Sequence, residues 1–406
     1  MCVMLSNNLT LGKEHTMDIL VAEKSGSAIQ RAIDEAAKAG GGRISLEPGT
    51  YPCATIWLRS NIELHIPAGA KLLGSSNPED YEDFVDPRLP VAPEKSRKVL
   101  LACRDAENVA VTGDGEIDGQ GPLFYDRNVP PGAFFAKPDK PRTRMVQFFK
   151  CRNVRFEGVT FRDSPGWTCW LVDCEDVHIH RIRIDGCQQM INNDGIDIDS
   201  CRRVTVSDSF FRTGDDCLIL RAIRRNLNEQ SICEHVVVTN CVLDSRCQAV
   251  RVGCPSDDTI RHCLFSNIVC RSRNGIFFEN PIRYLRKDCN GYLSASDIRF
   301  EHWDLECDDF PLRINVEGGI ALRKLERLEF RDFRFRSREP VYLVGNAGSQ
   351  LRDIVLSDFS GVVAKETPIV ASCVERLRLK DFEVSSGPGE AAKLERKPSP
   401  SWETQF

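Results

Sequence analysis

The feature that most constrains the fold is a short strand pattern that recurs along most of the chain, with almost no helical periodicity after residue 42. Each copy consists of an alternating apolar strand, a polar or glycine corner, and a second alternating strand. The spacing between copies is uneven, which is typical of a solenoid whose insertions lie in loops. The copies begin at Val109, Val154, Val177, Val204, Val236, Cys263, Ile298, Leu328, Ile354 and Leu377.

Residues 191–279 place polar side chains at matching positions of consecutive copies. When the inward-facing residues Ile196, Leu218, Val250 and Ile276 are aligned, one column holds Asp194, Asp216, Gln248 and Asn274. Arg251 and Phe277 then share the column three residues on, and Arg221 and Glu279 the column five residues on. Short strands of this kind also build sandwiches and propellers. The aligned columns favour an all-β parallel β-helix, in which each coil lies directly on the one before.

One amphipathic helix is expected, over residues 27–39. Ser27 and Gln30 form a candidate capping box, and the glycines at 40–42 end the apolar pattern. This helix would cover the N-terminal end of the solenoid, as a terminal cap must. We therefore expect a β-helix domain over residues 17–386, preceded by an extension at 1–16 and followed by a loose tail at 387–406.

Composition narrows the function classes. The formal net charge of the 406 residues is −5, which predicts no nucleic-acid partner, and no apolar run is long enough to span a membrane. The eighteen cysteines include no Cys-x-x-Cys pair, and several occupy apolar strand positions: Cys169, Cys217, Cys241, Cys263 and Cys270. The first residues show no signal-peptide pattern, so reduced thiols and a cytoplasmic location are expected.

Asp194, Asp215 and Asp216 are the candidate catalytic residues. Paired strands lie about 4.8 Å apart, so carboxylates on consecutive coils would be neighbours, and their repulsion would raise the pKa of at least one. A carboxylic acid beside a carboxylate is what glycoside hydrolysis requires. The alternative structural role is to satisfy backbone groups at solenoid corners. A calcium site would use the oxygens of Asp194, Asp197, Asp199, Asp215 and Asp216 and would indicate β-elimination on a uronate.

The chain resembles glycoside hydrolase family 28, the polygalacturonase-like group of right-handed, single-stranded parallel β-helix enzymes that act on pectin. The strongest signal is Asn192-Asn193-Asp194-Gly195-Ile196-Asp197 followed by Gly214-Asp215-Asp216-Cys217. Weaker matches are Ala39-Gly40-Gly41-Gly42, Pro48-Gly49-Thr50-Tyr51, Ile117-Asp118-Gly119-Gln120-Gly121 and Ser164-Pro165-Gly166-Trp167-Thr168.

The resemblance implies inverting hydrolysis, with Asp215 as the general acid and with Asp194 and Asp216 acting on the water. Asn192 would shape the site. The chain departs from the family where the motif histidine is replaced by Gln248, and where an Arg-Ile-Lys motif is replaced by Phe277-Phe278-Glu279. Losing two cations and gaining a carboxylate disfavours a uronate there, so specificity altered from polygalacturonase is expected.

Other candidate substrate-binding residues are Gln248, Arg221, Arg251, Glu279 and Trp167, the last by stacking on a sugar. The long segments 78–99 and 121–145 are expected to wall a cleft, consistent with exo action on an oligosaccharide. No cofactor and no metal is predicted, and side-by-side assembly into a homo-oligomer is possible for a solenoid. The alternatives are a β-helix lyase, epimerase or fructan transferase, and a non-catalytic carbohydrate-binding solenoid.

Overall fold

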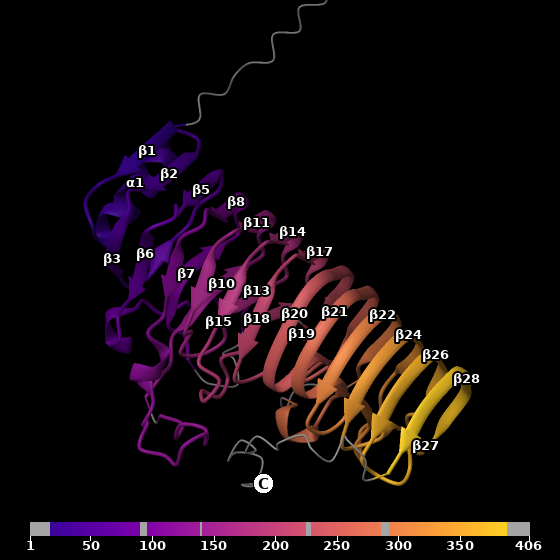
Figure 1. Cartoon of the computed structure of the whole chain (residues 1–406). Helices are drawn as coiled ribbons and strands as arrows, with labels where there is room; N and C mark the ends of the chain where they lie inside the picture. The colour runs from indigo at the N-terminus through magenta and orange to yellow at the C-terminus, as the bar shows by residue number, and fades with distance from the viewer. Residues whose placement is uncertain (1–16, 90–95, 139, 225–228, 286–291, 388–406) are drawn as a thin grey trace, which may run out of the picture.

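The computed structural model describes residues 17–89, 96–138, 140–224, 229–285 and 292–387, and the predicted extension and most of the predicted tail lie outside them. Figure 1 shows one elongated stack of coils that runs from the N-terminal helix to the last strand. All named strand pairs that form the stack are parallel. No helix among these residues is long and apolar enough to cross a bilayer.

Each coil contributes strands to three faces. The first face begins with β1 (Met17–Val21), β2 (Gly42–Leu46), β5 (Ile62–His65), β8 (Glu107–Thr112), β11 (Arg152–Glu157), β14 (Glu175–His180) and β17 (Arg202–Ser207). The second begins with β3 (Gly49–Cys53), β6 (Ala70–Gly74), β9 (Glu116–Asp118), β12 (Thr160–Arg162), β15 (Arg183–Asp185) and β18 (Phe210–Thr213). The third begins with β4 (Ile56–Trp57), β7 (Val99–Arg104), β10 (Arg144–Phe149), β13 (Cys169–Val172), β16 (Ile196–Asp199) and β19 (Leu218–Arg221).

In the later coils the strands of neighbouring faces merge. β20 (Ile232–Val252) and β21 (Thr259–Glu279) run through all three faces, and both bend at left-handed asparagines, Asn240 and Asn267. Asparagine tolerates this conformation better than most residues. The first two faces continue as β22 (Ser294–Cys307), β24 (Lys324–Ser337), β26 (Leu351–Val363) and β28 (Val374–Ser386), and the third as β23 (Leu312–Asn315), β25 (Val341–Val344) and β27 (Ile369–Ser372).

The predicted copies align in the register expected from the sequence. Val109 pairs with Val154, and the same column continues through the predicted starting residues to Leu377. Inward side chains stack from coil to coil, as Phe265, Phe300 and Phe330 do. The cysteines predicted at apolar positions are buried in this core.

The capping helix is α1 (Gly26–Lys38), and its buried residues include Ile29 and Ile33. Figure 1 shows it beside β1, β2 and β3 at the N-terminal end of the stack. Its N-cap is Ser25, whose hydroxyl accepts a hydrogen bond from the Ala28 amide, so the prediction of Ser27 as the cap was wrong. Ser27 lies inside the first turn because the helix begins one residue earlier than expected.

Candidate active site

The three candidate aspartates lie just before β16 and β19 on the third face. Close contact of the two coils fixes their positions, because the Gly195 amide donates to the Asp216 carbonyl at 2.8 Å. A side-chain carbon on Gly214 would lie 2.0 Å from the Met190 carbonyl oxygen, so this turn requires glycine. Asp194, Asp215 and Asp216 are respectively 3%, 4% and 1% exposed. The sequence prediction that they meet on consecutive coils is confirmed.

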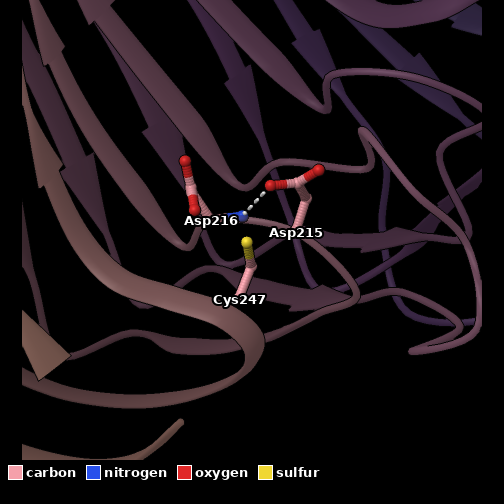
Figure 2. Close-up of side chains that lie close together, drawn as sticks. All are labelled: Asp215, Asp216 and Cys247. Atoms are coloured by element: carbon pink, nitrogen blue, oxygen red, sulfur yellow. Dashed lines mark hydrogen bonds between the residues drawn. The ribbon is translucent and has the colours of Figure 1, made fainter. Parts of the chain in front are cut away.

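Asp215 is held by the backbone. Its Oδ2 accepts a hydrogen bond from the Asn192 amide at 2.9 Å, and its Oδ1 accepts one from the Asp216 amide at 3.0 Å (Figure 2). The Asn193 side-chain oxygen accepts bonds from the amides of Gly214 and Asp215, at 2.9 and 3.2 Å. Asn192 therefore shapes the site through its backbone, and Asn193 ties the two coils together.

Asp216 is paired with a buried cation. Its Oδ2 lies 3.2 Å from the Arg251 guanidinium, and its Oδ1 accepts a hydrogen bond from the Gln248 amide at 3.1 Å. Burial raises the pKa of Asp216 to about 6, with a further increase from Asp215 and an opposing effect from Arg251. Arg251 also pairs with Glu279, so the acidic residue in place of the expected cation is neutralised within the protein.

Asp194 lies beside Arg221, with 4.0 Å between its Oδ2 and Nη2 of the arginine. The same guanidinium lies 2.8 Å from Asp197 Oδ1 and donates to the Cys254 carbonyl at 2.7 Å. Burial and the neighbouring carboxylates, Asp215 first among them, raise the pKa of Asp194 well above its usual range. Asp194 Oδ1 is buried and accepts no hydrogen bond from the described residues.

Part of the long segment 121–145 packs over these carboxylates. Tyr125, Phe134 and Phe135 form a buried apolar cluster with Met190 and Ile191, directly before the Asn192 turn. From the same segment, Arg142 donates to Asn192 Oδ1 at 2.8 Å and to the Ile191 carbonyl at 2.8 Å. The expectation that this segment would border the site agrees with these contacts.

Trp167 is placed differently from the prediction. It is 4% exposed, lies edge-on to Trp170, and has the Arg221 guanidinium 4.2 Å from its ring centre. A ring covered in this way is not presented to a sugar, and it supports the Arg221 side chain instead. Phe84, from the segment 78–99, packs into the same aromatic cluster and stacks on Trp57.

A cleft of about 320 Å³ opens on the C-terminal side of the carboxylates. Gln248 and Arg251, which contact Asp216, line one end of it. Gln248 Oε1 is buried without a hydrogen-bond donor among the described residues. Arg273, Asn274, Phe277, Glu279, Arg283, Asp309, Phe310, Arg313, Asn315 and Glu317 form the rest of the lining.

The five aspartates considered for calcium do not form one oxygen cage. Asp197 pairs with Arg221, and Asp199 accepts hydrogen bonds from Ser200 and Trp170. A smaller group, Asp215, Asp216 and Cys247, brings its ligand atoms within 4.8 Å of one another (Figure 2). All four carboxylate oxygens of this group already accept hydrogen bonds from the protein, so we assign no metal to it.

Three residues of the site were missed by sequence reasoning. Asn193 was identified only as part of a motif. The two hydrogen bonds that its side-chain oxygen accepts could have been inferred from its place in the turn. Arg142 reaches Asn192 across fifty positions of sequence, and no local pattern reveals such a contact. Arg313 lines the cleft from β23, which lies outside residues 191–279, where the columns were aligned.

Comparisons with known proteins agree with this geometry. The model of "Glycosyl hydrolases family 28" matches residues 87–241, which contain all three aspartates. Over these residues the chain is similar to glycoside hydrolase family 28. A probable polygalacturonase from Arabidopsis thaliana is 31% identical over 139 residues, covering 34% of this chain and 28% of the relative. Polygalacturonase QRT2 from the same plant is 24% identical over 244 residues, covering 59% and 49%.

The chain thus spans at most about half the length of these two relatives. A solved exopolygalacturonase from Thermotoga maritima superposes with a TM-score of 0.75 at 21% identity, covering 91% of this chain and 92% of that one. The predicted fold, a right-handed single-stranded parallel β-helix, is confirmed.

Proposed function

We propose that this protein is a glycoside hydrolase that cleaves an oligosaccharide with the Asp194, Asp215 and Asp216 carboxyl groups. The observation that carries the proposal is the burial of three carboxyl groups together, which raises the pKa of Asp194 and brings that of Asp216 to about 6. Raised pKa values in neighbouring carboxyl groups allow a proton and a negative charge to be present together closer to neutral pH than in isolated aspartates. Those are the acid and the base of glycoside hydrolysis.

In the proposed reaction one carboxyl group donates its proton to the glycosidic oxygen as the bond from that oxygen to the anomeric carbon breaks. A water molecule forms the new bond to that carbon and gives its proton to a second carboxylate. Family resemblance assigns the acid to Asp215 and the handling of water to Asp194 and Asp216, with inversion of configuration. Asp194 Oδ1, buried with no donor among the described residues, supports a contact with that water.

We also propose exo action and a specificity different from polygalacturonase. Support for the first is the packing of segment 121–145 against the Asn192 turn on one side of the carboxylates. Support for the second is the replacement of two expected cations by Phe277 and by Glu279, which is already paired with Arg251.

The test is the release of reducing sugar from oligosaccharides and aryl glycosides by the wild type and by Asp215→Asn. Removing an acid or base group lowers rates by about 10²- to 10⁴-fold, so we expect a loss in that range with an unchanged melting temperature. Asp304→Asn, at an exposed strand position, is the matched control. Activity within threefold of wild type in Asp215→Asn would contradict the proposal.

The pH dependence of the rate distinguishes the roles of the individual aspartates. If Asp215 is the acid, Asp215→Asn abolishes the basic limb of the rate profile, and Asp194→Asn abolishes the acidic limb. Burial favours the proton on Asp194, so the reverse result would exchange the two roles. Proton NMR of the first product anomer tests inversion. An unsaturated product absorbing in the ultraviolet would indicate a lyase.

A further inference from the structure

One peptide unit connects the long segment 121–145 to the Asp215 carboxylate. The amide of Asn192 donates a hydrogen bond to Asp215 Oδ2 at 2.9 Å. On the opposite edge of the same peptide plane, the Ile191 carbonyl oxygen accepts a hydrogen bond from the Arg142 guanidinium at 2.8 Å. Because a peptide unit is planar, the direction of its carbonyl bond fixes the direction of its N–H bond. The position of Arg142 therefore helps to set the direction of the Asn192 amide.

The Arg142 side chain is itself held by buried contacts. It is 4% exposed, and its guanidinium donates to the Tyr125 hydroxyl at 2.7 Å and to Asn192 Oδ1 at 2.8 Å. Its backbone carbonyl accepts a hydrogen bond at 2.6 Å from the hydroxyl of Ser96, in the other long segment. The Tyr125 hydroxyl also lies 2.6 Å from the Ile191 carbonyl oxygen. Two buried donors thus converge on that carbonyl.

The backbone of Asn192 depends on this support. Its φ of 56° lies in the left-handed region, which asparagine adopts more readily than most residues but does not prefer. Arg142 holds the turn at two points, the Ile191 carbonyl and the Asn192 side-chain oxygen. Without these two hydrogen bonds the amide can rotate away from Asp215.

The charge of Arg142 also affects Asp215 through the peptide unit. Linked hydrogen bonds polarise one another where the dielectric constant is low, so a cation at the carbonyl oxygen makes the N–H of the same unit a stronger donor. A hydrogen bond to the charged form of a carboxyl group favours that form. The second oxygen of Asp215 accepts a bond from the Asp216 amide, so backbone N–H groups hold both of its oxygens (Figure 2).

We propose that Arg142 is a positioning residue of the reaction, which acts on Asp215 through the Ile191–Asn192 peptide. This inference rests on the proposed function and adds to it a residue that acts through another. Arg142 keeps the Asp215 carboxyl group in its orientation and favours its charged form. Other titratable and charged groups around the site, which substitutions at Arg142 leave in place, include Asp194, Asp216, Cys247, Tyr125, Arg221 and Arg251.

The experiment compares Arg142→Met, Arg142→Lys and Tyr125→Phe in the full-length protein. Methionine removes the charge and all the donors, lysine keeps the charge without the planar fork, and phenylalanine removes only the hydroxyl beside the Ile191 carbonyl. Arg224→Met removes an arginine that lies 2.7 Å from Asp258, beyond the far end of β19, and it controls for loss of stability. Melting temperatures check that each variant folds.

We expect Arg142→Met to lower kcat by about 10- to 100-fold, because a displacement of about 1 Å at the reacting groups has an effect of this order. KM should stay within about threefold of the wild-type value. Arg142→Lys should lose less activity than Arg142→Met.

The rate profile distinguishes positioning from a general loss of stability. In Arg142→Met, the limb that Asp215→Asn abolishes should move to higher pH by about one pH unit, the size expected for losing a hydrogen bond to a charged group. Tyr125→Phe should give a smaller movement in the same direction. Arg224→Met should leave both limbs at their wild-type pH.

Hydrogen exchange gives a measurement that does not depend on activity. Exchange of the segment 190–195, followed by mass spectrometry, should be about tenfold faster in Arg142→Met than in the wild type, because the Asn192 amide loses its fixed acceptor. The same segment should exchange at the wild-type rate in Arg224→Met.

A wild-type rate profile together with wild-type exchange in Arg142→Met would overturn the inference. An equal fall in kcat in Arg224→Met, with no movement of the limb in either variant, would also overturn it. If Arg142→Met does not fold, unmoved limbs in both Arg142→Lys and Tyr125→Phe would overturn it.

The inference and the proposed function fail in different ways. Faster exchange in Arg142→Met, in a protein whose wild type cleaves no oligosaccharide, would support the action of Arg142 on the Asn192 amide and contradict the proposed function. An active wild type whose limbs do not move in Arg142→Met would overturn the inference and leave the proposed function standing.

Discussion

The coils around β16 and β19 differ from the coils around β23 and β25, although all four strands lie on the same face. Every residue of β16 and β19 is buried, whereas β23 and β25 alternate between buried and half-buried positions. The additional cover over the earlier coils comes from the aromatic cluster around Trp167 and the segment after residue 121. The same repeat therefore forms a half-buried face in the later coils and a buried polar site in the earlier ones.

The comparison explains why similar residues behave differently. Arg221 lies 2.8 Å from Asp197 with the arginine side chain 6% exposed, and Arg331 lies 2.8 Å from Glu329 with the arginine 50% exposed. The two ion pairs have the same separation, but the arginine side chains differ in their exposure to solvent. The strand alone leaves such an ion pair at the surface. It becomes part of a buried site where a neighbouring segment packs over it.

The largest expected effect comes from breaking these two pairs. Arg221→Met leaves Asp194 and Asp197 buried without their cation, and loss of one partner of a buried pair costs about 3–5 kcal/mol. Arg331→Met should cost less than about 1 kcal/mol, because exposed pairs contribute little. Urea unfolding of both variants measures the difference. Equal losses would show that burial does not distinguish the two ion pairs.

A smaller effect is expected from backbone crowding. In Gly214→Ala the added carbon would lie 2.0 Å from the Met190 carbonyl, and such overpacking costs about 1–3 kcal/mol. For Gly318, in the later coils, no atom lies within 4 Å of where the added carbon would be. Gly318→Ala should therefore be neutral or stabilise the protein by about 0.4–1 kcal/mol. Thermal unfolding and activity test both variants. A Gly214→Ala variant with wild-type stability would show that the turn at Asn192 shifts to accommodate the added carbon.

The smallest effect is a difference in pH dependence between two aspartates. The folded pKa of Asp216 is raised to about 6 by burial, so between about pH 4 and pH 6 the folded state binds more protons than the unfolded state and stability falls as pH rises. The pKa of Asp297 is lowered to about 2 by Arg327, so its contribution is present above pH 4 and is lost as pH falls toward 2.

Melting temperatures from pH 2.5 to pH 8 measure both contributions. Asp216→Asn should become progressively more stable relative to the wild type as the pH rises from 4 to 7. Asp297→Asn should be less stable than the wild type at pH 7 and similar to it near pH 2.5. If the stabilities of both variants, relative to the wild type, changed with pH in the same direction, the opposite pKa shifts assigned to Asp216 and Asp297 would be wrong.

The sequence predicted the coil register because inward apolar residues repeat with period two, and one residue of slip would expose the whole core. That constraint also brought Asp194 and Asp216 together. The period-two pattern does not determine which side chain contacts which partner. Arg221 and Arg251 were predicted to contact substrate, and that stays a prediction. In the structure each contacts an aspartate, a choice of partner that depends on side-chain conformation and on cover from distant segments.

The shared column of Trp170, Asp197, Ile219, Arg251, Phe277 and Arg313 has a consequence for how such a protein can diversify. Each coil supplies a single residue to this column, so one codon governs one position along this face of the stack. Substitutions more than about 7–10 Å apart act nearly independently. A change at Arg313 can therefore alter the lining of the cleft while Asp194, Asp215 and Asp216 keep their arrangement.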